Sequence, residues 1–226
     1  MMKRKEYFDI VQGSKKWIEL RMGIFTSSTI ESLFKEPKSK KDKEAGIWSD
    51  TAMSLIIDKA CEIIYLTPKD KIYNKALEWG NMYEDYAAEA YQEVTGNEVK
   101  KVGFVTLGDN TGTSPDRYSN DNALVEIKCP HVRSNHVKNI LKLQGQEDLL
   151  KKDKQYYYQI QHQLYVTGRE YCDFVSFDPR ILETAKPKSW KKCIHVLKIE
   201  KDNTIDFESK IKAAADYRDY ILKQFL

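Results

Sequence analysis

Residues 113–128 read Thr-Ser-Pro-Asp-Arg-Tyr-Ser-Asn-Asp-Asn-Ala-Leu-Val-Glu-Ile-Lys, and this stretch indicates both the fold and the chemistry. Its last part, continued by Cys129, is apolar apart from Glu126 and Lys128 and predicts a buried strand. Residues two apart point to the same face of a strand, so these two charges project side by side. Asp116 is expected to return beside them from the preceding loop. Two carboxylates and an ammonium group are suited to metal-assisted cleavage of a phosphodiester.

A surface strand with an ordinary Glu/Lys pair is the simpler alternative for this pattern. Two details favour the functional interpretation. The rest of the strand is Leu, Val, Ile and Cys, and charges on a buried strand need a partner or a metal. Pro115 also stiffens the approach of Asp116 to the strand.

Two polar residues on predicted helices extend this candidate site. Glu84 falls on the apolar side of a helix predicted from about Asn74 to Val94, as either a third metal-directed carboxylate or a paired core carboxylate. Gln161 shares a helical face with Tyr165. Simple packing of that helix against the sheet is the alternative for Gln161.

The N-terminal segment offers a candidate phosphate site. Arg21 is followed by the hydroxyls of Thr26 and Ser28 at a predicted helix start. Unpaired backbone N–H groups and the helix dipole favour an anion at such a position. A plain helix cap with a surface arginine explains these residues equally well.

The order of predicted elements indicates an α/β (α+β) fold with a central mixed sheet flanked by helices. We expect one domain over 1–226, with a helical part (1–97), a sheet-containing core (98–200) and a C-terminal helix (204–226). The predicted helices cover 14–34, divided at Gly23 with Thr26 as the second N-cap, and 48–65, 74–94, 155–166 and 205–225. The predicted strands cover 101–107, 124–129, 171–177 and 193–199, and 35–44 is predicted as an exposed loop.

Composition narrows the class of protein. The 226 residues are 41% hydrophobic and 31% charged, with a net charge of +3 that is too small to identify a nucleic-acid binder. No apolar run is long enough to span a membrane, so no membrane association is expected. The four cysteines have no C-x-x-C spacing, which indicates reduced thiols and a cytoplasmic location rather than a zinc site or disulfides: Cys61, Cys129, Cys172 and Cys193.

Several motifs together resemble the RecB-like branch of the restriction-endonuclease-like PD-(D/E)xK superfamily. More narrowly, the chain resembles the lambda exonuclease and YqaJ family of viral recombination nucleases. The matching motifs run in the family's order from residue 17 to residue 180. They are Trp17-x-x-x-Arg21-x-Gly23-x-x-Thr26-x-Ser28, Trp79-Gly80-x-x-Tyr83-Glu84, Ser114-Pro115-Asp116, Glu126-Ile127-Lys128-Cys129-Pro130, Gln159-x-Gln161 and Asp178-Pro179-Arg180.

The resemblance implies a restriction-endonuclease-like core and a catalytic role for specific residues. Asp116, Glu126 and the Ile127 carbonyl are expected to bind Mg²⁺, which Mn²⁺ can replace, with support from Glu84. Lys128 is expected to orient or activate the attacking water, and Gln161 to help position it.

The resemblance also implies a pocket for the 5′-phosphate of the DNA end. Arg21, Thr26, Ser28 and Ser114 match family positions of this pocket. The family has an arginine shortly after the Cys-Pro motif. Ser134 occupies that position here, and Arg133 precedes it as the candidate replacement.

The implied activity is 5′-to-3′ digestion of one strand of double-stranded DNA, leaving 3′ single-stranded tails for recombination by strand annealing. The implied partners are DNA ends, a single-strand annealing protein and two further copies in a ring-shaped homotrimer, in a bacterial or phage-infected cell. Three alternatives stay open: a RecB-like nuclease of other polarity or an endonuclease, a non-catalytic DNA-binding module, and an interaction protein whose acidic cluster is structural.

Overall fold

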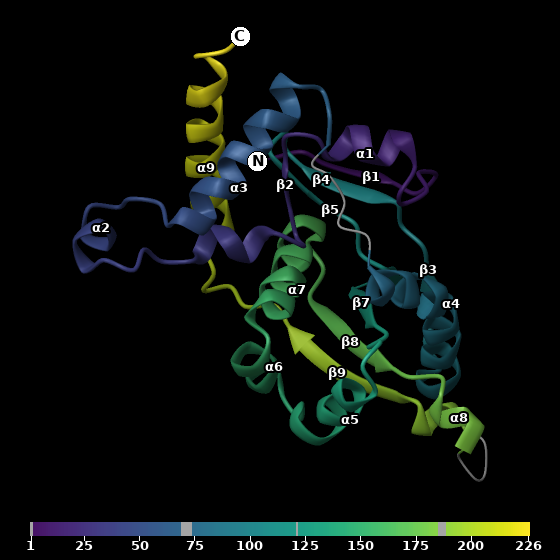
Figure 1. The fold of residues 1–226 in the computed structure, drawn as a ribbon. Coiled ribbons are helices and arrows are strands. Elements are labelled where there is room, and N and C mark those ends of the chain that lie inside the picture. Colours follow the sequence, from purple (N-terminus) through teal and green to yellow (C-terminus); the bar gives the residue numbers. More distant parts are fainter. Residues whose placement is uncertain (1, 69–73, 121, 185–188) are drawn as a thin grey trace.

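Two β-sheets with helices packed around them form the computed structural model, which describes residues 2–68, 74–120, 122–184 and 189–226 (Figure 1). The larger sheet has the strand order β3-β6-β7-β8-β9, and the smaller has the order β1-β4-β5-β2. Both sheets mix parallel and antiparallel pairs. The mixed α/β fold expected from the sequence is therefore confirmed.

The larger sheet is built around two parallel central strands. Its strands are β3 (Val99–Lys100), β6 (Arg117–Ser119), β7 (Ala123–Lys128), β8 (Tyr171–Phe177) and β9 (Ile194–Glu200). Strands β7 and β8 pair in parallel from Ala123 opposite Tyr171 to Lys128 opposite Ser176, while the other pairs are antiparallel. A parallel pair needs a long crossover. Three helices supply it: α5 (Arg133–Lys142), α6 (Gln146–Lys152) and α7 (Lys154–Thr167).

Alternation along β7 divides the core into two layers. Leu124 packs with Ile160 and Leu164 of α7, whereas Val125 and Ile127 pack with α4 (Lys75–Thr95) on the opposite face. Glu126 and Lys128 have the parity of Leu124 and therefore point to the α7 side. Helix α7 also contacts β4 and β5, so it lies between the two sheets (Figure 1).

The N-terminal part contributes strands as well as helices. Strands β1 (Arg4–Tyr7), β4 (Phe104–Leu107), β5 (Thr111–Thr113) and β2 (Phe25–Thr26) form the smaller sheet. Around it lie α1 (Lys15–Arg21), a 3₁₀ helix η1 (Ile30–Phe34), α3 (Asp50–Ile64) and the C-terminal α9 (Phe207–Leu222). Helices α3 and α9 pack against each other and share a core with Phe25.

The sequence-based boundaries are wrong in several places. Thr26, predicted as a helix N-cap, lies in β2 because Phe25 and Thr26 pair with Thr111 and Gly112 across the chain. Part of the predicted loop over 35–44 forms the short helix α2 (Lys40–Glu44), whose N-cap is Ser39. The elements missed entirely include β1, β3, β5, β6, α5, α6, α8 (Ile181–Thr184) and η2 (Trp190–Lys192). Within the described ranges, no helix is long and apolar enough to cross a lipid bilayer.

Candidate active site

Glu126 lies at the centre of a buried polar group on the α7 side of β7. The residue is 1% exposed. One carboxylate oxygen accepts from the Lys128 ammonium and from the Gln159 amide, both at 2.6 Å, and the other accepts from the Gln163 amide at 2.7 Å. These donors hold a charged carboxylate where burial alone would disfavour it.

Asp116 returns beside the same strand. Its Oδ2 accepts from the backbone N–H of Ile127 at 2.6 Å. The N–H and C=O of a strand residue point to the same neighbouring strand, so the Ile127 carbonyl also faces the Asp116 side. Burial, followed by the negative charges of Glu126 and Glu84, raises the pKa of Asp116 well above its ordinary value. The site therefore concentrates negative charge that a cation would stabilise.

Lys128 supplies a positive charge next to these carboxylates. Burial alone would lower the pKa of Lys128, but the charges of Glu126 and Asp116 raise it above its usual value. Its ammonium also lies 4.5 Å from the ring centroid of Tyr156. Lys128 is consequently protonated at neutral pH in this arrangement.

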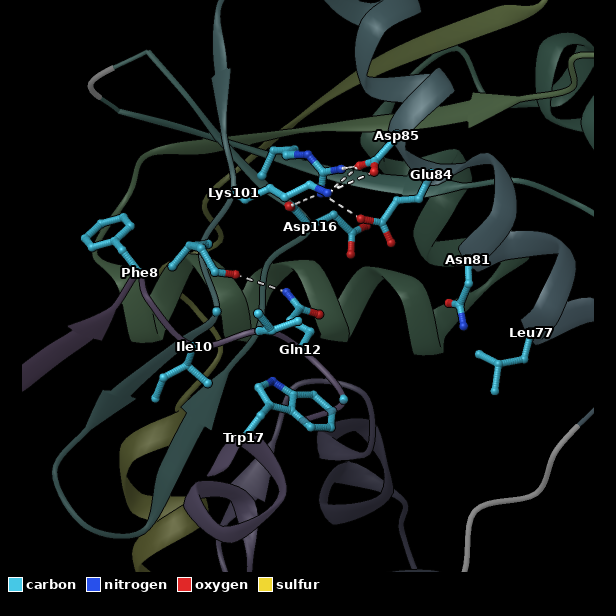
Figure 2. Close-up of a pocket in the computed structure, with 15 residues that line it drawn as sticks. Phe8, Ile10, Gln12, Trp17, Leu77, Asn81, Glu84, Asp85, Lys101 and Asp116 are labelled. Atoms are coloured by element: carbon cyan, nitrogen blue, oxygen red, sulfur yellow. Dashed lines mark hydrogen bonds and ion pairs between the residues drawn. The ribbon is translucent and has the colours of Figure 1, made fainter. Parts of the chain in front are cut away.

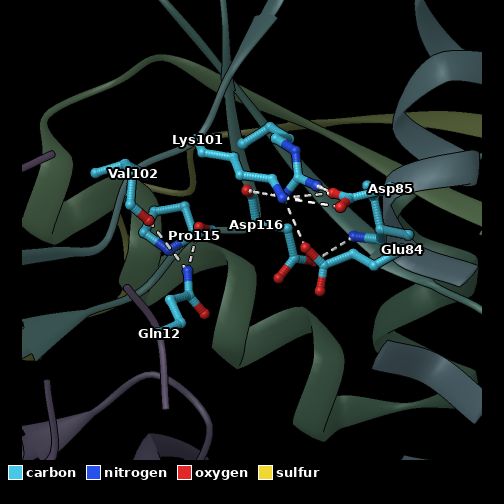
Figure 3. A network of polar contacts seen from close by, with 9 residues as sticks. Gln12, Glu84, Asp85, Lys101, Val102, Pro115 and Asp116 are labelled. Carbon is cyan, nitrogen blue, oxygen red and sulfur yellow. Dashed lines mark hydrogen bonds and ion pairs between the residues drawn. The ribbon is translucent and has the colours of Figure 1, made fainter. Parts of the chain in front are cut away.

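Glu84 reaches the site from α4 and is tied to a buried arginine. Arg117 Nη1 donates to Glu84 Oε1 at 2.6 Å and to the Asp116 carbonyl at 2.6 Å, while Nη2 pairs with Asp85. Lys101 pairs with Asp85 from the other side at 2.7 Å. Figure 3 shows this network, with the Glu84 and Asp116 carboxylates directed toward the same space. Arg117 thus fixes the position of Glu84 relative to Asp116.

Gln161, which the family resemblance expects to help position the attacking water, hydrogen-bonds to Glu200 and Asp202. Its amide donates to the Glu200 carbonyl at 2.8 Å and accepts from the Asp202 N–H at 2.7 Å. Tyr165, on the same helical face, stacks on Phe207. This face of α7 therefore packs on the chain after β9, and Gln159 and Gln163 on another face contact Glu126.

The oxygen donors fit a hard divalent cation. Among the residues that the structure describes, no three His, Cys, Asp or Glu side chains are close enough to form a metal cluster. Asp116, Glu126 and the Ile127 carbonyl instead offer two carboxylates and one carbonyl, and Glu84 lies beside them in a hydrogen bond with Arg117. Mg²⁺ is typically bound through one or two carboxylates, waters and substrate phosphates. The charge repulsion that raises the pKa of Asp116 is what such an ion offsets.

A second group of candidate residues adjoins this site. The Arg21 guanidinium carbon lies 4.0 Å from the ring centroid of Trp17, and the Trp17 indole N–H donates to Ser114 Oγ at 2.8 Å. Trp17 lines a cavity that also contains Glu84 and Asp116 in its wall (Figure 2). Burial lowers the pKa of Arg21 to about 10, opposed by the charge of Glu62. Arg21 therefore remains charged at neutral pH.

The other predicted phosphate ligands are placed differently. Thr26 is buried within β2, because its backbone pairs with β5. Ser28 is exposed, and its carbonyl accepts from the Gln155 amide at 3.4 Å. Arg133 is exposed at the first position of α5. The structure thus links Arg21 to Ser114 through Trp17, and it places Thr26, Ser28 and Arg133 outside this group.

Arg180 joins three motifs that are far apart in the sequence. Its guanidinium pairs with Asp178 at 2.7 Å and stacks 4.4 Å from the ring centroid of Trp79. It also donates to the carbonyls of Pro130 and His131, both at 3.1 Å. Arg180 therefore braces the turn that follows β7 and Lys128.

Several site residues escaped the sequence analysis. Gln159 and Gln163 lie four residues apart, and Tyr156 precedes Gln159 by three, so helical spacing places them on one face. The Arg117 contacts carry no local signal. Gln12 has no local sequence signal either. Its amide donates to the Val102 and Pro115 carbonyls at 3.1 and 3.2 Å and so supports the segment that leads to Asp116 (Figure 3).

The carboxylate–lysine centre on this fold defines the class of protein as a nuclease. The model of the YqaJ-like viral recombinase domain matches residues 16–170, which is more than half of the chain, and the chain belongs to this family. The family resemblance noted in the sequence is thereby confirmed. A search of curated proteins finds no match.

Solved structures of exonucleases share the fold. An alkaline exonuclease from Laribacter hongkongensis is 24% identical with a TM-score of 0.68, and 93% of each chain is covered. The same exonuclease in complex with dAMP gives a TM-score of 0.70 at 24% identity, again with 93% of each chain covered. A phage-related exonuclease from Haemophilus somnus 129PT is 22% identical with a TM-score of 0.69, covering 90% of this chain and 96% of that chain. At these identities the likeness establishes the fold.

Proposed function

We propose that the chain is a Mg²⁺-dependent 5′-to-3′ exonuclease that degrades one strand of double-stranded DNA and leaves 3′ single-stranded tails. One observation carries this proposal. Trp17, which stacks on Arg21 and donates to Ser114, lines a cavity with Glu84 and Asp116, and these two carboxylates also line the cavity that contains Glu126 and Lys128. A cleavage centre next to a cationic site suits an enzyme that holds a DNA terminus and cuts beside it.

Each residue of the centre has a role in hydrolysis. A bound divalent cation lowers the pKa of a coordinated water and offsets charge on the scissile phosphate. Asp116, Glu126 and the Ile127 carbonyl would hold this cation, and Gln159 and Gln163 fix the Glu126 carboxylate. The protonated Lys128 orients the attacking water and places positive charge where the phosphate becomes more anionic. Glu84, fixed by Arg117, supports the metal site from α4.

The 5′-phosphate is held on the Trp17 side of the centre. Arg21 presents a charged guanidinium whose direction is set by stacking on Trp17. Ser114 supplies a hydroxyl two residues before Asp116, so a phosphate bound there lies close to the metal site. Ser28, Thr26 and Arg133 stay further candidates for DNA contact by their motif positions.

Family membership extends the proposal to partners and location. Double-stranded DNA ends are the substrate, a single-strand annealing protein takes over the 3′ tail, and three copies form a ring around the DNA. The reaction takes place in the cytoplasm of a bacterial or phage-infected cell. Mn²⁺ can replace Mg²⁺, since both accept carboxylate and carbonyl ligands.

The direct test is a strand-mapping digestion. A linear duplex carrying one 5′-phosphate is incubated with Mg²⁺, and the two strands are labelled separately. The proposal expects loss of the 5′-phosphorylated strand and slower attack on a 5′-hydroxyl duplex. Arg21→Gln should reduce the difference in digestion rate between the 5′-phosphate duplex and the 5′-hydroxyl duplex.

Other outcomes identify the alternatives. Cleavage of a closed circle would indicate an endonuclease, and loss of nucleotides from the 3′ end would indicate a nuclease of other polarity. DNA binding without digestion in Mg²⁺ or Mn²⁺ would indicate a non-catalytic binding module. Absence of DNA binding at low salt would indicate an interaction protein.

A further inference from the structure

A cavity extends from Asp116 and Glu126 to a wall whose residues have no role in the proposed reaction. Its volume is about 920 Å³, near the upper end of the range for small-ligand pockets. The near wall contains Asp116, Glu126 and Lys128. The far wall contains polar and charged side chains from α5, the end of α6 and the start of α7: Asn135, Asn139, Lys152, Asp153 and Gln155. The cavity therefore has room for more of a DNA strand than the scissile phosphate.

A buried hydrogen-bond network fixes the direction of Lys152. Its ammonium donates to Asn139 Oδ1. The Asn139 amide in turn donates at 2.9 Å to Oγ of the fully buried Ser176 on β8. His136 Nδ1 lies 2.9 Å from the same Ser176 oxygen. Lys152 is thus anchored to the central sheet, unlike a freely rotating surface lysine.

Two more lysines lie on α5, the helix whose Asn139 accepts from Lys152. Lys138 and Lys142 are one helical turn apart on α5, and the side chains of Asn135 and Asn139 lie on the same stripe. Burial lowers the pKa of Lys152, the neighbouring Asp153 charge opposes this, and the positive charges of Lys142 and Lys138 lower the pKa further. Across the described ranges of the chain, no carboxylate forms an ion pair with any of these three lysines. We name Lys138, Lys142 and Lys152 the α5–α6 lysine cluster.

Lysines that repel one another and form no ion pair with a carboxylate are stabilised by an external anion. Lys151, the neighbour of Lys152, shows the contrast: it pairs with Glu147 at 3.9 Å, is largely exposed and does not line the cavity. Lys152 lines one cavity and Trp17 lines the other, and the two cavities share Asp116 and Glu84, so the carboxylates lie between Lys152 and Trp17. A strand held by its 5′-phosphate at Trp17 must pass the carboxylates before it reaches the cluster.

We infer that the α5–α6 lysine cluster binds backbone phosphates of the cleaved DNA strand on the 3′ side of the scissile phosphate. This inference rests on the proposed function, because that function sets the strand direction. The cluster keeps the shortened strand in place after each cut, so that the next phosphate can move to the metal site without release of the DNA.

The test separates this contact from catalysis. Equilibrium binding of a 5′-phosphorylated duplex is measured over a range of salt concentrations for the wild type, Lys142→Gln and the Lys142→Gln/Lys152→Gln double variant. Each lost phosphate contact should reduce the slope of log K against log salt by about 1. The matched control Lys151→Gln should leave the slope unchanged. Lys142 is not part of the hydrogen-bond network that joins Lys152 through Asn139 to Ser176. The Lys142→Gln single variant therefore remains informative even if the loss of Lys152 unfolds the double variant.

Neutral linkages then identify the strand. A methylphosphonate placed two to four nucleotides inside the 5′ end of the cleaved strand should weaken wild-type binding and leave the double variant unaffected. The same linkage in the complementary strand should affect both proteins equally. Unchanged salt slopes, or a variant effect that follows the complementary strand, would overturn the inference. Failure of the proposed function itself would show separately, as absence of digestion by the wild type.

Discussion

Protonation of His162 should destabilise the protein in mild acid. His162 lies on α7, one residue before Gln163, and is fully buried. Its Nδ1 lies 2.7 Å from Ser27 Oγ and its Nε2 lies 2.9 Å from Thr111 Oγ1. Burial lowers the pKa of His162 to about 3. A neutral imidazole therefore joins the helix that holds Glu126 to both β5 and the segment after β2.

The direction of the pH effect follows from proton linkage. The folded pKa is below the unfolded value of about 6.5, so the unfolded state binds more protons between these values, and the stability present above pH 6.5 is lost as pH falls toward 3. The loss is small at pH 7, about 0.2 kcal/mol, and reaches about 2 kcal/mol at pH 5. This is a large fraction of a typical folding free energy.

Urea unfolding at a series of pH values measures this effect. His162→Gln removes the titrating group and should flatten the pH dependence of the free energy of unfolding between pH 7 and 5 by about 2 kcal/mol, whatever its stability at pH 7. His131→Gln changes an exposed histidine and is the control. If the His162→Gln variant keeps the wild-type pH dependence, the reasoning about its burial is wrong.

Three further substitutions test the supports of the site. Arg117→Met leaves Glu84 without its cation and should slow Mg²⁺-dependent digestion about tenfold, roughly 1.4 kcal/mol in the transition state, in a single-turnover assay. Gly23→Ala should lower the free energy of unfolding by about 2 kcal/mol, because Gly23 has φ +74° and a Cβ there would lie 2.5 Å from Ile63; thermal denaturation measures this. Arg180→Ala removes the stacking on Trp79 and two hydrogen bonds to the turn after β7. It should speed amide hydrogen exchange at His131 and Val132 without changing exchange in α9.

The strand with Glu126 and Lys128 was predictable because its signal is local. Side-chain direction alternates along a strand, which shows which side chains share a face. The helix that starts after Asn74 and ends before Gly96 carries its own cap residues at both ends. Expectations that depended on such local patterns agree with the structure to within a few residues.

The features that sequence analysis missed depend on contacts between distant segments. Strand β2 exists only through pairing with β5, which overrides the helix start suggested by Thr26. Arg117 pairs with carboxylates more than thirty residues away, and no local pattern marks it. On α7, the spacing of Gln159, Gln161 and Gln163 does not show which helical face contacts Glu126. The hydrogen bonds of Gln161 to Glu200 and Asp202 show that its face packs elsewhere.

Digestion of a 5′-phosphorylated duplex by Asp116→Asn in Mg²⁺ tests the central claim most directly. The substitution keeps the size of the side chain and an oxygen that can accept from the Ile127 N–H, but removes the charge. Asp109→Asn, at an exposed turn, is the matched control. The account predicts that Asp116→Asn loses digestion at every Mg²⁺ concentration while its unfolding transition and DNA binding persist. Near-wild-type digestion by Asp116→Asn would contradict the assignment of the metal site.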